Sequence, residues 1–359
     1  MRPEPYEVLI QNGLLRSAGA RLLAAFDRKP SLTAVISVAP VRKHWEAALT
    51  GSLGDAGLES FIVEMRDGER YKTLSGLEEL ALKLVKRGVD RQSALVAFGG
   101  GVVGDVAGLL ASIYMRGVRF AQIPTSLLAQ VDASIGGKTG VNLSAGKNLL
   151  GTFYHPRTVL IDPEVLATLP EREYRSGLYE ALKCGIIRSR ELFEFMQKER
   201  ERILQRDAGA LEWLITECVK IKAEVVAADE REGDLRRILN FGHTIGHALE
   251  AETAYRQFLH GEAVAWGMVA ASMIAAGMHK TSSETAQRII SAVLAYSPLP
   301  RVEARSKNIA RRVLSDKKTV DGVAHFVLPR EIGEVEIVRN VPDRAVLQAI
   351  EELRYLSRI

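Results

Sequence analysis

Short apolar runs alternate with amphipathic segments along the first half of the chain. Thr33–Val38, Ser93–Phe98 and Thr158–Ile161 have the length and the β-branched or small apolar residues of buried strands. Between two of these runs, Leu77–Arg87 carries apolar residues at helical spacing. Strands that alternate with helices predict a parallel sheet, so residues 1–165 are expected to form a Rossmann-like α/β domain.

Beyond Ile161 the strand pattern nearly vanishes. Apolar residues between Leu211 and Val226 fall at helical spacing, and Ala263–Met278 carries no charge. The latter is shorter than the roughly 20 residues of a membrane span and contains two glycines, which predicts a buried core helix. Ala324–Leu328 predicts a late strand or short hairpin. Residues 166–359 are therefore expected to form a mainly α-helical domain.

Composition narrows the class of protein. The chain has 359 residues, of which 47% are hydrophobic and 26% charged, as in ordinary folded proteins. Cys184 and Cys218 lack the C-x-x-C spacing of metal or redox sites and are expected to be buried thiols. No signal segment is apparent, which predicts a cytoplasmic protein without membrane partners. A net charge of +4 without a basic run argues against nucleic acid and allows small anionic ligands.

A glycine-rich turn follows the run that ends at Phe98. Gly99, Gly101 and Gly104 satisfy G-x-G-x-x-G where a strand meets a helix, a pattern that lets backbone N–H groups bind a pyrophosphate. The acidic residue expected about twenty positions later in a dinucleotide fingerprint is absent from Arg119–Pro124. By its position alone, Asp105 could be the N-cap of the following helix.

A second glycine cluster, Gly136–Thr139, is similar to the end of a phosphate-binding Walker A loop. The first glycine of that motif is replaced by Asp132, which excludes an ATPase of this class. The segment still brings Lys138, Lys147 and Asn148 close to Asp132 among small residues. Such a set suits a polyhydroxylated anion.

Histidines are concentrated in one later segment. His243 and His247 are four residues apart and so share one helix face, and His260 follows. Two histidines, one carboxylate and an open position form a common catalytic zinc site. Glu180, Glu250 and Glu262 are candidate carboxylates, and spacing does not choose among them. Histidines with ordinary hydrogen bonds remain the alternative.

Several sequence motifs, spread over nearly the whole chain, match those of a known family in the same order. The chain resembles the 3-dehydroquinate synthase family of sugar phosphate cyclases. The matching blocks are Phe98–Asp105, Tyr114–Gly117, Gln122–Asp132, Ser134–Thr139, Gly146–Asn148, Glu180–Lys183, Ala228–Glu232, Leu239–His247 and Leu259–Glu262.

This resemblance implies an NAD-binding N-terminal domain, a metal-binding C-terminal domain and a homodimer. It implies that Glu180, His243 and His260 bind zinc or cobalt, with His247 handling protons. The implied NAD contacts are Glu69, Lys72, Gly99, Gly100, Gly101, Gly104, Asp105, Thr125, Ser126, Asp132, Lys138, Lys147 and Thr168. The implied substrate-binding residues are Arg116 from a partner subunit, Asp132, Lys138, Lys147, Asn148, Lys183, Lys222, Glu232, Arg236, Asn240, His247, Lys317 and Lys318. Asp132, Lys138, Asn148, Lys222, Arg236 and His247 would be the catalytic residues.

The reaction implied by the resemblance is that of a lyase in the shikimate pathway. 3-Deoxy-D-arabino-heptulosonate 7-phosphate would be oxidised transiently by NAD, lose phosphate, be reduced again and close to 3-dehydroquinate. One departure is Ser37–Val41, where the family usually has an acidic or amide residue near NAD. Two alternatives remain, a cyclase for another sugar phosphate and a metal-dependent alcohol dehydrogenase. Arg236, Asn240 and Lys318 favour an acid-bearing substrate.

Overall fold

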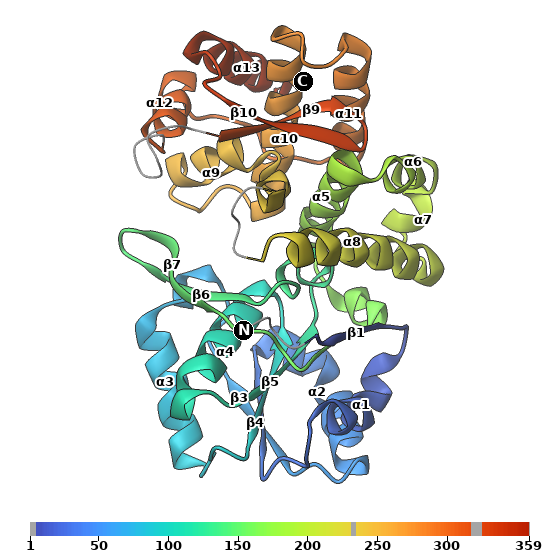
Figure 1. Ribbon diagram of the computed structural model, residues 1–359, viewed down its shortest axis with the longest axis vertical. Coiled ribbons are helices and arrows are strands. Elements are labelled where there is room, and N and C mark those ends of the chain that lie inside the picture. The colour runs from blue at the N-terminus through green and yellow to red at the C-terminus, as the bar shows by residue number, and fades with distance from the viewer. Residues whose placement is uncertain (1–4, 231–234, 317–324, 359) are drawn as a thin grey trace. The chain divides into compact units, whose positions relative to one another are not determined.

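The computed structural model describes residues 5–230, 235–316 and 325–358. It divides into two compact units (Figure 1). Unit 1 comprises Met1–Pro170 and Arg206–Val219, and unit 2 comprises Glu171–Gln205 and Lys220–Ile359. Helix α8 (Ala208–Ala228) runs from the first unit into the second.

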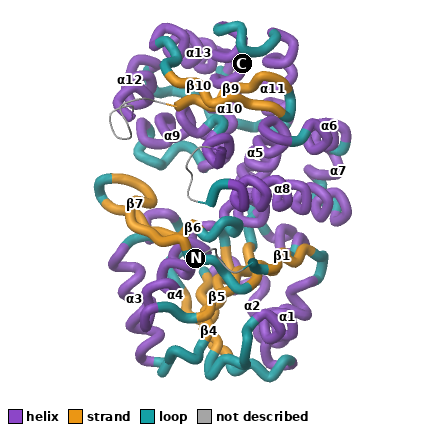
Figure 2. The backbone as a smooth tube through the Cα atoms, viewed as in Figure 1, coloured by secondary structure: helices purple, strands orange, loops and turns teal. Residues whose placement is uncertain are grey.

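Unit 1 is built around a parallel sheet, whose strands are drawn in orange in Figure 2. The strand order is β1-β8-β5-β4-β2-β3. The strands β2, β4 and β8 are completely buried and β5 nearly so, as expected for a sheet covered on both faces. The strands are β1 (Glu7–Ile10), β2 (Thr33–Ser37), β3 (Ser60–Glu64), β4 (Ala94–Gly99), β5 (Arg119–Pro124) and β8 (Thr158–Ile161).

Helices cover both faces of this sheet. Alternate residues of one strand point to opposite faces, and β4 shows the division clearly: Leu95 and Ala97 belong to one apolar core, and Val96 and Phe98 to the other. The first core packs against α3 (Leu74–Lys86) and α4 (Gly101–Ile113), and the second against α1 (Ala18–Ala25) and α2 (Ala39–Asp55). Unit 1 is therefore a three-layer α/β structure. Its short helices are η1 (Leu14–Ser17), η2 (Glu69–Tyr71), η3 (Tyr114–Arg116), η4 (Ala129–Ala133) and η5 (Pro163–Thr168).

An antiparallel hairpin separates β5 from β8. Its strands are β6 (Lys138–Leu143) and β7 (Gly146–Phe153), and their register is interrupted between Val141 and Leu143. Val141 pairs with Leu150, and Leu143 pairs with Gly146. Residues 147–149 therefore bulge opposite Asn142. The sequence did not predict this hairpin.

Unit 2 is mainly helical. At its centre α10 (His260–Gly277) is buried along nearly its whole length. It packs against α5 (Glu171–Arg188), α9 (His243–Glu252), α11 (Ser283–Ala295), α13 (Asp343–Leu356) and the hairpin of β9 (His325–Glu331) and β10 (Glu334–Arg339). The remaining helices are α6 (Arg190–Lys198), α7 (Arg200–Leu204), α12 (Ser306–Asp316) and the short η6 (Leu235–Asn240).

The predicted fold class is confirmed. The helix expected over 211–226 lies within α8, the expected core helix is α10, and the late hairpin is β9–β10. Cys184 and Cys218 are buried and are not in a disulfide, as expected. Within the described ranges, no helix is both long and apolar enough to cross a membrane.

Candidate active site

The glycine-rich turn lies where the strand order reverses. After β2 the chain moves to β3 on one side, whereas β4 pairs on the other side. Ligands of open α/β sheets bind at the carboxyl ends of the strands at such a point. The turn is held by Ser37, whose Oγ donates a hydrogen bond to Phe98 O at 2.7 Å. Ser37, which lies where this chain differs from the usual family sequence, therefore stabilises the turn.

Helix α4 offers an uncapped N-terminus in this turn. Its N-cap is Gly100, which has no side chain to bond the first N–H groups. These amides and the helix dipole can bind an anion. The alternative that Asp105 is the N-cap is wrong, because the helix begins earlier, at Gly101. Thr125 N donates to Gly99 O at 3.0 Å, which brings the end of β5 beside the turn.

A polar network connects the turn to the β6–β7 hairpin. The buried Lys72 lies 2.5 Å from Asp105 Oδ2 and also donates to Asn148 Oδ1. Glu69 accepts a hydrogen bond from Asn142 Nδ2 at 2.7 Å. The network thus connects four predicted site residues with Asn142: Glu69, Lys72, Asp105 and Asn148. Sequence reasoning missed Asn142, because a lone asparagine in an unpredicted strand gives no signal.

The other predicted residues of unit 1 lie beside the glycine-rich turn, in the β6–β7 hairpin or beside α2. A Cβ on Gly100 would lie 3.3 Å from Ser126 Oγ, and one on Gly101 would lie 3.2 Å from Ala133, next to Asp132. Lys138 begins β6 and is exposed, and Lys147 is half-buried in the bulge. Thr168 accepts a hydrogen bond from Trp45 Nε1 at 2.7 Å, which places it beside α2 rather than in the Lys72 network.

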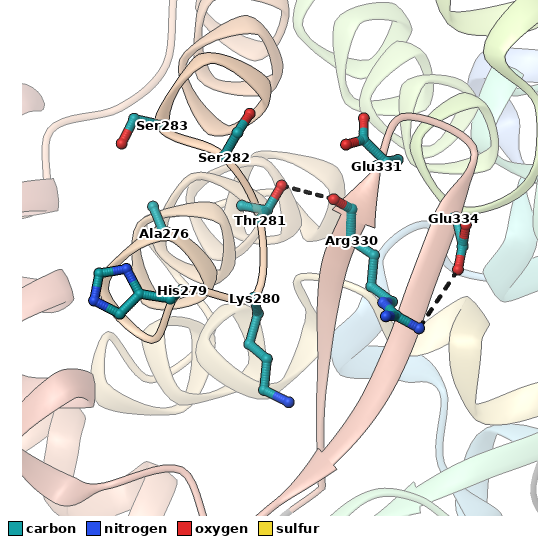
Figure 3. A pocket seen from close by; sticks show the side chains of 9 residues that line it. All are labelled: Ala276, His279, Lys280, Thr281, Ser282, Ser283, Arg330, Glu331 and Glu334. Carbon is teal, nitrogen blue, oxygen red and sulfur yellow. Dashed lines mark hydrogen bonds and ion pairs between the residues drawn. The ribbon is translucent and has the colours of Figure 1, made fainter.

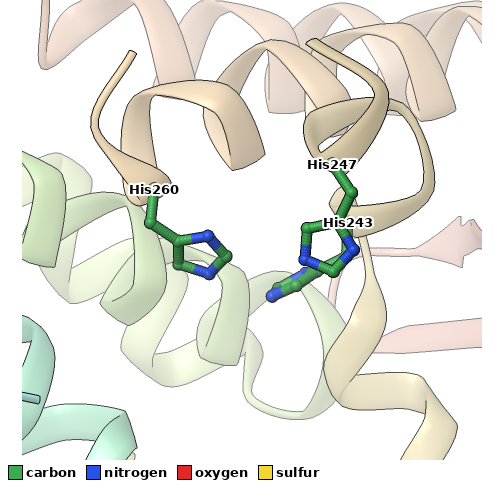
Figure 4. A group of neighbouring side chains, drawn as sticks. All are labelled: His243, His247 and His260. Atoms are coloured by element: carbon green, nitrogen blue, oxygen red, sulfur yellow. The ribbon is translucent and has the colours of Figure 1, made fainter. Parts of the chain in front are cut away.

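Three histidines of unit 2 lie together (Figure 4). The ring centroids of His243 and His247 are 5.3 Å apart, and those of His243 and His260 are 5.2 Å apart. Each offers one ring nitrogen, and the three nitrogens lie within 4.8 Å of one another. The predicted shared face of His243 and His247 is confirmed.

Glu180 on α5 faces the same point. Its Oε1 lies 3.6 Å from His260 Nε2 and 3.9 Å from His243 Nε2. The carboxylate is completely buried, and neither oxygen accepts a hydrogen bond among the described residues, although Lys183 Nζ lies 2.5 Å from Oε2. Lys183 already pairs with Oε2, whereas Oε1, which faces the histidines, has no hydrogen-bond partner among the described residues and would be satisfied by a cation. The donor set therefore fits a divalent metal.

Glycines bring these helices into backbone contact. A Cβ on Gly261 would lie 2.0 Å from Ser176 O of α5, and one on Gly267 would lie 1.8 Å from Gly242 O before α9. Only glycine allows such approaches of α10 to its neighbours. The approaches place His260 beside the residues of α5 and α9.

The other candidate carboxylates have different surroundings. Glu250 Oε2 lies 3.4 Å from Nδ1 of His260, on the far side of the ring from Glu180. Glu262 accepts from Arg172 at 2.6 and 2.7 Å and from Leu259 N at 2.7 Å, at the start of α10. Of the three, only Glu180 has an oxygen aimed between two Nε2 atoms. Glu250 is placed to orient His260, a role that sequence reasoning missed.

The charge state of His243 suits a metal ligand. Burial lowers the pKa of this imidazole well below its usual value, and the positive charge of Lys183 lowers it further. His243 is therefore neutral near pH 7. Its Nδ1 is 3.1 Å from Phe241 O, so the Nδ1–H tautomer leaves Nε2 available toward Glu180.

Buried basic groups also belong to unit 2. Lys183, Lys222 and Arg236 are buried, and Arg236 donates to Glu230 O while its backbone N–H donates to Asp229. Asn240 ends η6 and is half-buried. Glu232, Lys317 and Lys318 lie outside the described residues.

A separate depression of about 630 Å³ lies at the start of α11 (Figure 3). Its charged residues are paired: Lys280 with Glu336 at 3.3 Å and Arg330 with Glu334 at 3.8 Å. None of the predicted site residues lines it.

Comparisons with known proteins agree with this architecture. Residues 62–176 match the family model described as 3-dehydroquinate synthase N-terminal, and residues 177–319 match 3-dehydroquinate synthase C-terminal. The chain is 62% identical to a 3-dehydroquinate synthase of Koribacter versatilis over 98% of this chain and 96% of that protein.

Solved structures extend the comparison. A 2-epi-5-epi-valiolone synthase from Streptomyces hygroscopicus with bound NAD+ and Zn2+ has a TM-score of 0.90 at 30% identity, covering 99% of this chain and 98% of that one. A 2-deoxy-scyllo-inosose synthase complexed with carbaglucose-6-phosphate, NAD+ and Co2+ has a TM-score of 0.86 at 26% identity, covering 97% and 96%. With matches to both family models and a full-length relative this similar, the chain belongs to the 3-dehydroquinate synthase family.

Proposed function

We propose that this chain converts 3-deoxy-D-arabino-heptulosonate 7-phosphate to 3-dehydroquinate and phosphate. This is the lyase reaction that gives the family its name, and it belongs to the shikimate pathway of aromatic amino acid biosynthesis. The observation that carries the proposal is the buried Glu180 carboxylate aimed between the Nε2 atoms of His243 and His260. The full-length similarity to a 3-dehydroquinate synthase supports the same reaction.

Glu180, His243 and His260 are the proposed ligands of one zinc or cobalt ion. When bound, the metal supplies Lewis acidity toward a substrate hydroxyl, and NAD supplies reversible acceptance of hydride. Three histidines are an alternative ligand set, since their nitrogens also converge. Oε1 of Glu180 faces two Nε2 atoms and accepts no hydrogen bond among the described residues, which favours the set that includes this carboxylate.

His247 is proposed to hold and transfer a proton at a ring nitrogen. It stands one helical turn from His243, within reach of a substrate bound at the same point. Asp132, Lys138, Asn148, Lys222 and Arg236 complete the proposed catalytic set. The lysines and Arg236 would bind the phosphate and carboxylate of the substrate and stabilise negative charge as it develops.

Unit 1 is proposed to bind NAD. The uncapped start of α4 would bind the pyrophosphate, because its N–H groups have no side-chain acceptor at Gly100. Glu69, Lys72, Asp105, Thr125 and Ser126 lie around that turn or in the network attached to it. Thr168 stays in the proposal on the resemblance alone.

The substrate is proposed to carry an acid group. Unit 2 holds the basic side chains of Lys183, Lys222 and Arg236, whose N–H groups suit charge-assisted hydrogen bonds to an anion. A phosphorylated sugar acid supplies both phosphate and carboxylate. The neutral-sugar cyclases and the alcohol dehydrogenase remain the competing functions.

We further propose a cytoplasmic homodimer. The β6–β7 hairpin exposes Leu149 and Phe153, and the end of α4 and the following η3 expose Ile113 and Met115, apolar side chains that a second copy would cover. Met115 and Arg116 adopt left-handed backbone conformations with φ of 48° and 69°. This constrained turn presents the exposed Arg116 outward, as a residue contributed to a partner's site would require.

A phosphate-release assay with the heptulosonate phosphate tests the function. We expect release that requires NAD and a divalent metal, with no net change of absorbance at 340 nm because NAD is regenerated. Sedoheptulose 7-phosphate and glucose 6-phosphate are the control substrates. Preference for either control, or accumulation of NADH, would contradict the proposal in favour of its two competitors.

A further inference from the structure

The irregular hairpin of unit 1 contains a polar residue with three structural contacts. Asn142 N donates to Lys72 O at 2.8 Å, its Nδ2 donates to Glu69 Oε1 at 2.7 Å, and its Oδ1 accepts from Asn148 N at 2.8 Å. Asn142 also forms an isolated parallel bridge with Thr73. One side chain thus joins the segment 69–73 to the bulge in β7.

The bulge explains why Asn148 needs such a contact. Residues 147–149 stand opposite the single residue Asn142, so the regular ladder cannot satisfy their backbone groups. Asn148 adopts φ of +54°, a left-handed conformation that is unfavourable for most residues and better tolerated by asparagine. The amide oxygen of Asn142 replaces the missing ladder acceptor and stabilises this conformation.

The conformation of Asn148 decides where its side chain lies. With the bulge in place, Asn148 Oδ1 accepts a hydrogen bond from Lys72, which is also paired with Asp105. Glu69, Lys72 and Asp105 are proposed NAD contacts, whereas Asn148 is a proposed substrate contact. The network therefore joins residues of both binding functions through Asn142.

We propose that Asn142 is a positioning residue that holds Asn148 for the substrate and Glu69 for NAD. The inference rests on the proposed function and adds a residue that contacts neither ligand. Its two amide groups have separable tasks: the oxygen supports Asn148, and the nitrogen supports Glu69. A carboxylate of the same shape keeps the first task and loses the second.

Two variants separate these tasks. Asn142→Ala removes both contacts, so we expect the dissociation constant for NAD+ to rise about fivefold or more and kcat to fall about tenfold or more. Asn142→Asp keeps an acceptor for Asn148 N and places a second charge beside Glu69. It should recover kcat to within about threefold of the wild type while NAD+ binding stays weak. Ser144→Ala, at an exposed position of the same hairpin, is the matched control.

A third measurement is independent of turnover. Amide hydrogen exchange across residues 143–150 should accelerate in Asn142→Ala and not in Asn142→Asp or Ser144→Ala. The inference is overturned if Asn142→Ala matches Ser144→Ala in NAD+ binding and exchange, or if Asn142→Asp loses as much kcat as Asn142→Ala. If the wild type does not release phosphate, the proposed function is contradicted. NAD+ binding and amide hydrogen exchange would still test the role of Asn142.

Discussion

The two candidate binding regions are built in opposite ways. In unit 2, the imidazoles and Glu180 are carried by long helices that touch through glycines, and the carboxylate is fully buried. In unit 1, the Lys72 network depends on a bulged hairpin, a left-handed Asn148 and hydrogen bonds near solvent. Helix packing positions the functional side chains of unit 2, whereas hydrogen bonds and ion pairs position those of unit 1. Substitutions should therefore cost most in unit 2, where the functional side chains surround a fully buried carboxylate.

The largest effect is expected at a proposed metal ligand. His243→Ala should lose the metal and reduce turnover by about a thousandfold or more, because a binding site with two remaining ligands holds zinc weakly. Metal content by elemental analysis and phosphate release measure the two losses. His247→Ala is the matched control on the same helix face and should keep the metal while losing rate. Equal metal loss in both variants would favour the three-histidine ligand set.

A smaller effect is expected at Glu250, which is not a proposed metal ligand but lies in the same region. Its carboxylate lies 3.4 Å from Nδ1 of His260 and would orient that ring. Glu250→Ala should weaken zinc affinity by about 10–100-fold, as is typical for partners of metal-bound histidines. Competition with a chromogenic chelator measures the affinity. An unchanged dissociation constant would show that packing alone orients His260.

The exposed Lys138 provides the corresponding test in unit 1. Lys138→Ala should raise KM for the heptulosonate phosphate about tenfold, because one charged hydrogen bond to phosphate is removed. Steady-state kinetics with thermal melting as a stability control measure this effect. If KM stays the same, Lys138 does not bind the substrate.

The last effect concerns the stability of the metal-free protein at different pH values. Since burial lowers the pKa of His243, the unfolded chain binds a proton near pH 6.5 that the folded chain does not. Stability should therefore fall as pH drops below about 6.5, by up to about 1.4 kcal/mol per pH unit from this group. Urea unfolding at several pH values measures the slope, and His243→Gln should flatten it. An identical slope in that variant would assign the dependence to other groups.

Sequence patterns predicted the helical region better than the polar network. The spacing of His243 and His247 directly gave a shared helix face, and the run Thr158–Ile161 has the same bounds as β8. The carboxylate could not be chosen by spacing, because Glu180 lies on another helix and its position depends on the packing of α10. The β6–β7 hairpin was missed, because glycines, lysines and a bulge interrupt the alternation by which strands are recognised. The N-cap alternative for Asp105 failed because a glycine already begins the helix.

Gly267 has a consequence for natural variation in this chain. Alanine is usually the most innocuous replacement inside a helix, yet here one added methyl carbon would fall 1.8 Å from the carbonyl oxygen of Gly242. The helix carrying His260 would have to move away from the helix carrying His243. A variant with alanine at position 267 would therefore keep every acid, imidazole and lysine of the proposed site and still be inactive. The presence of the reactive side chains alone would not reveal that such an allele has lost its function.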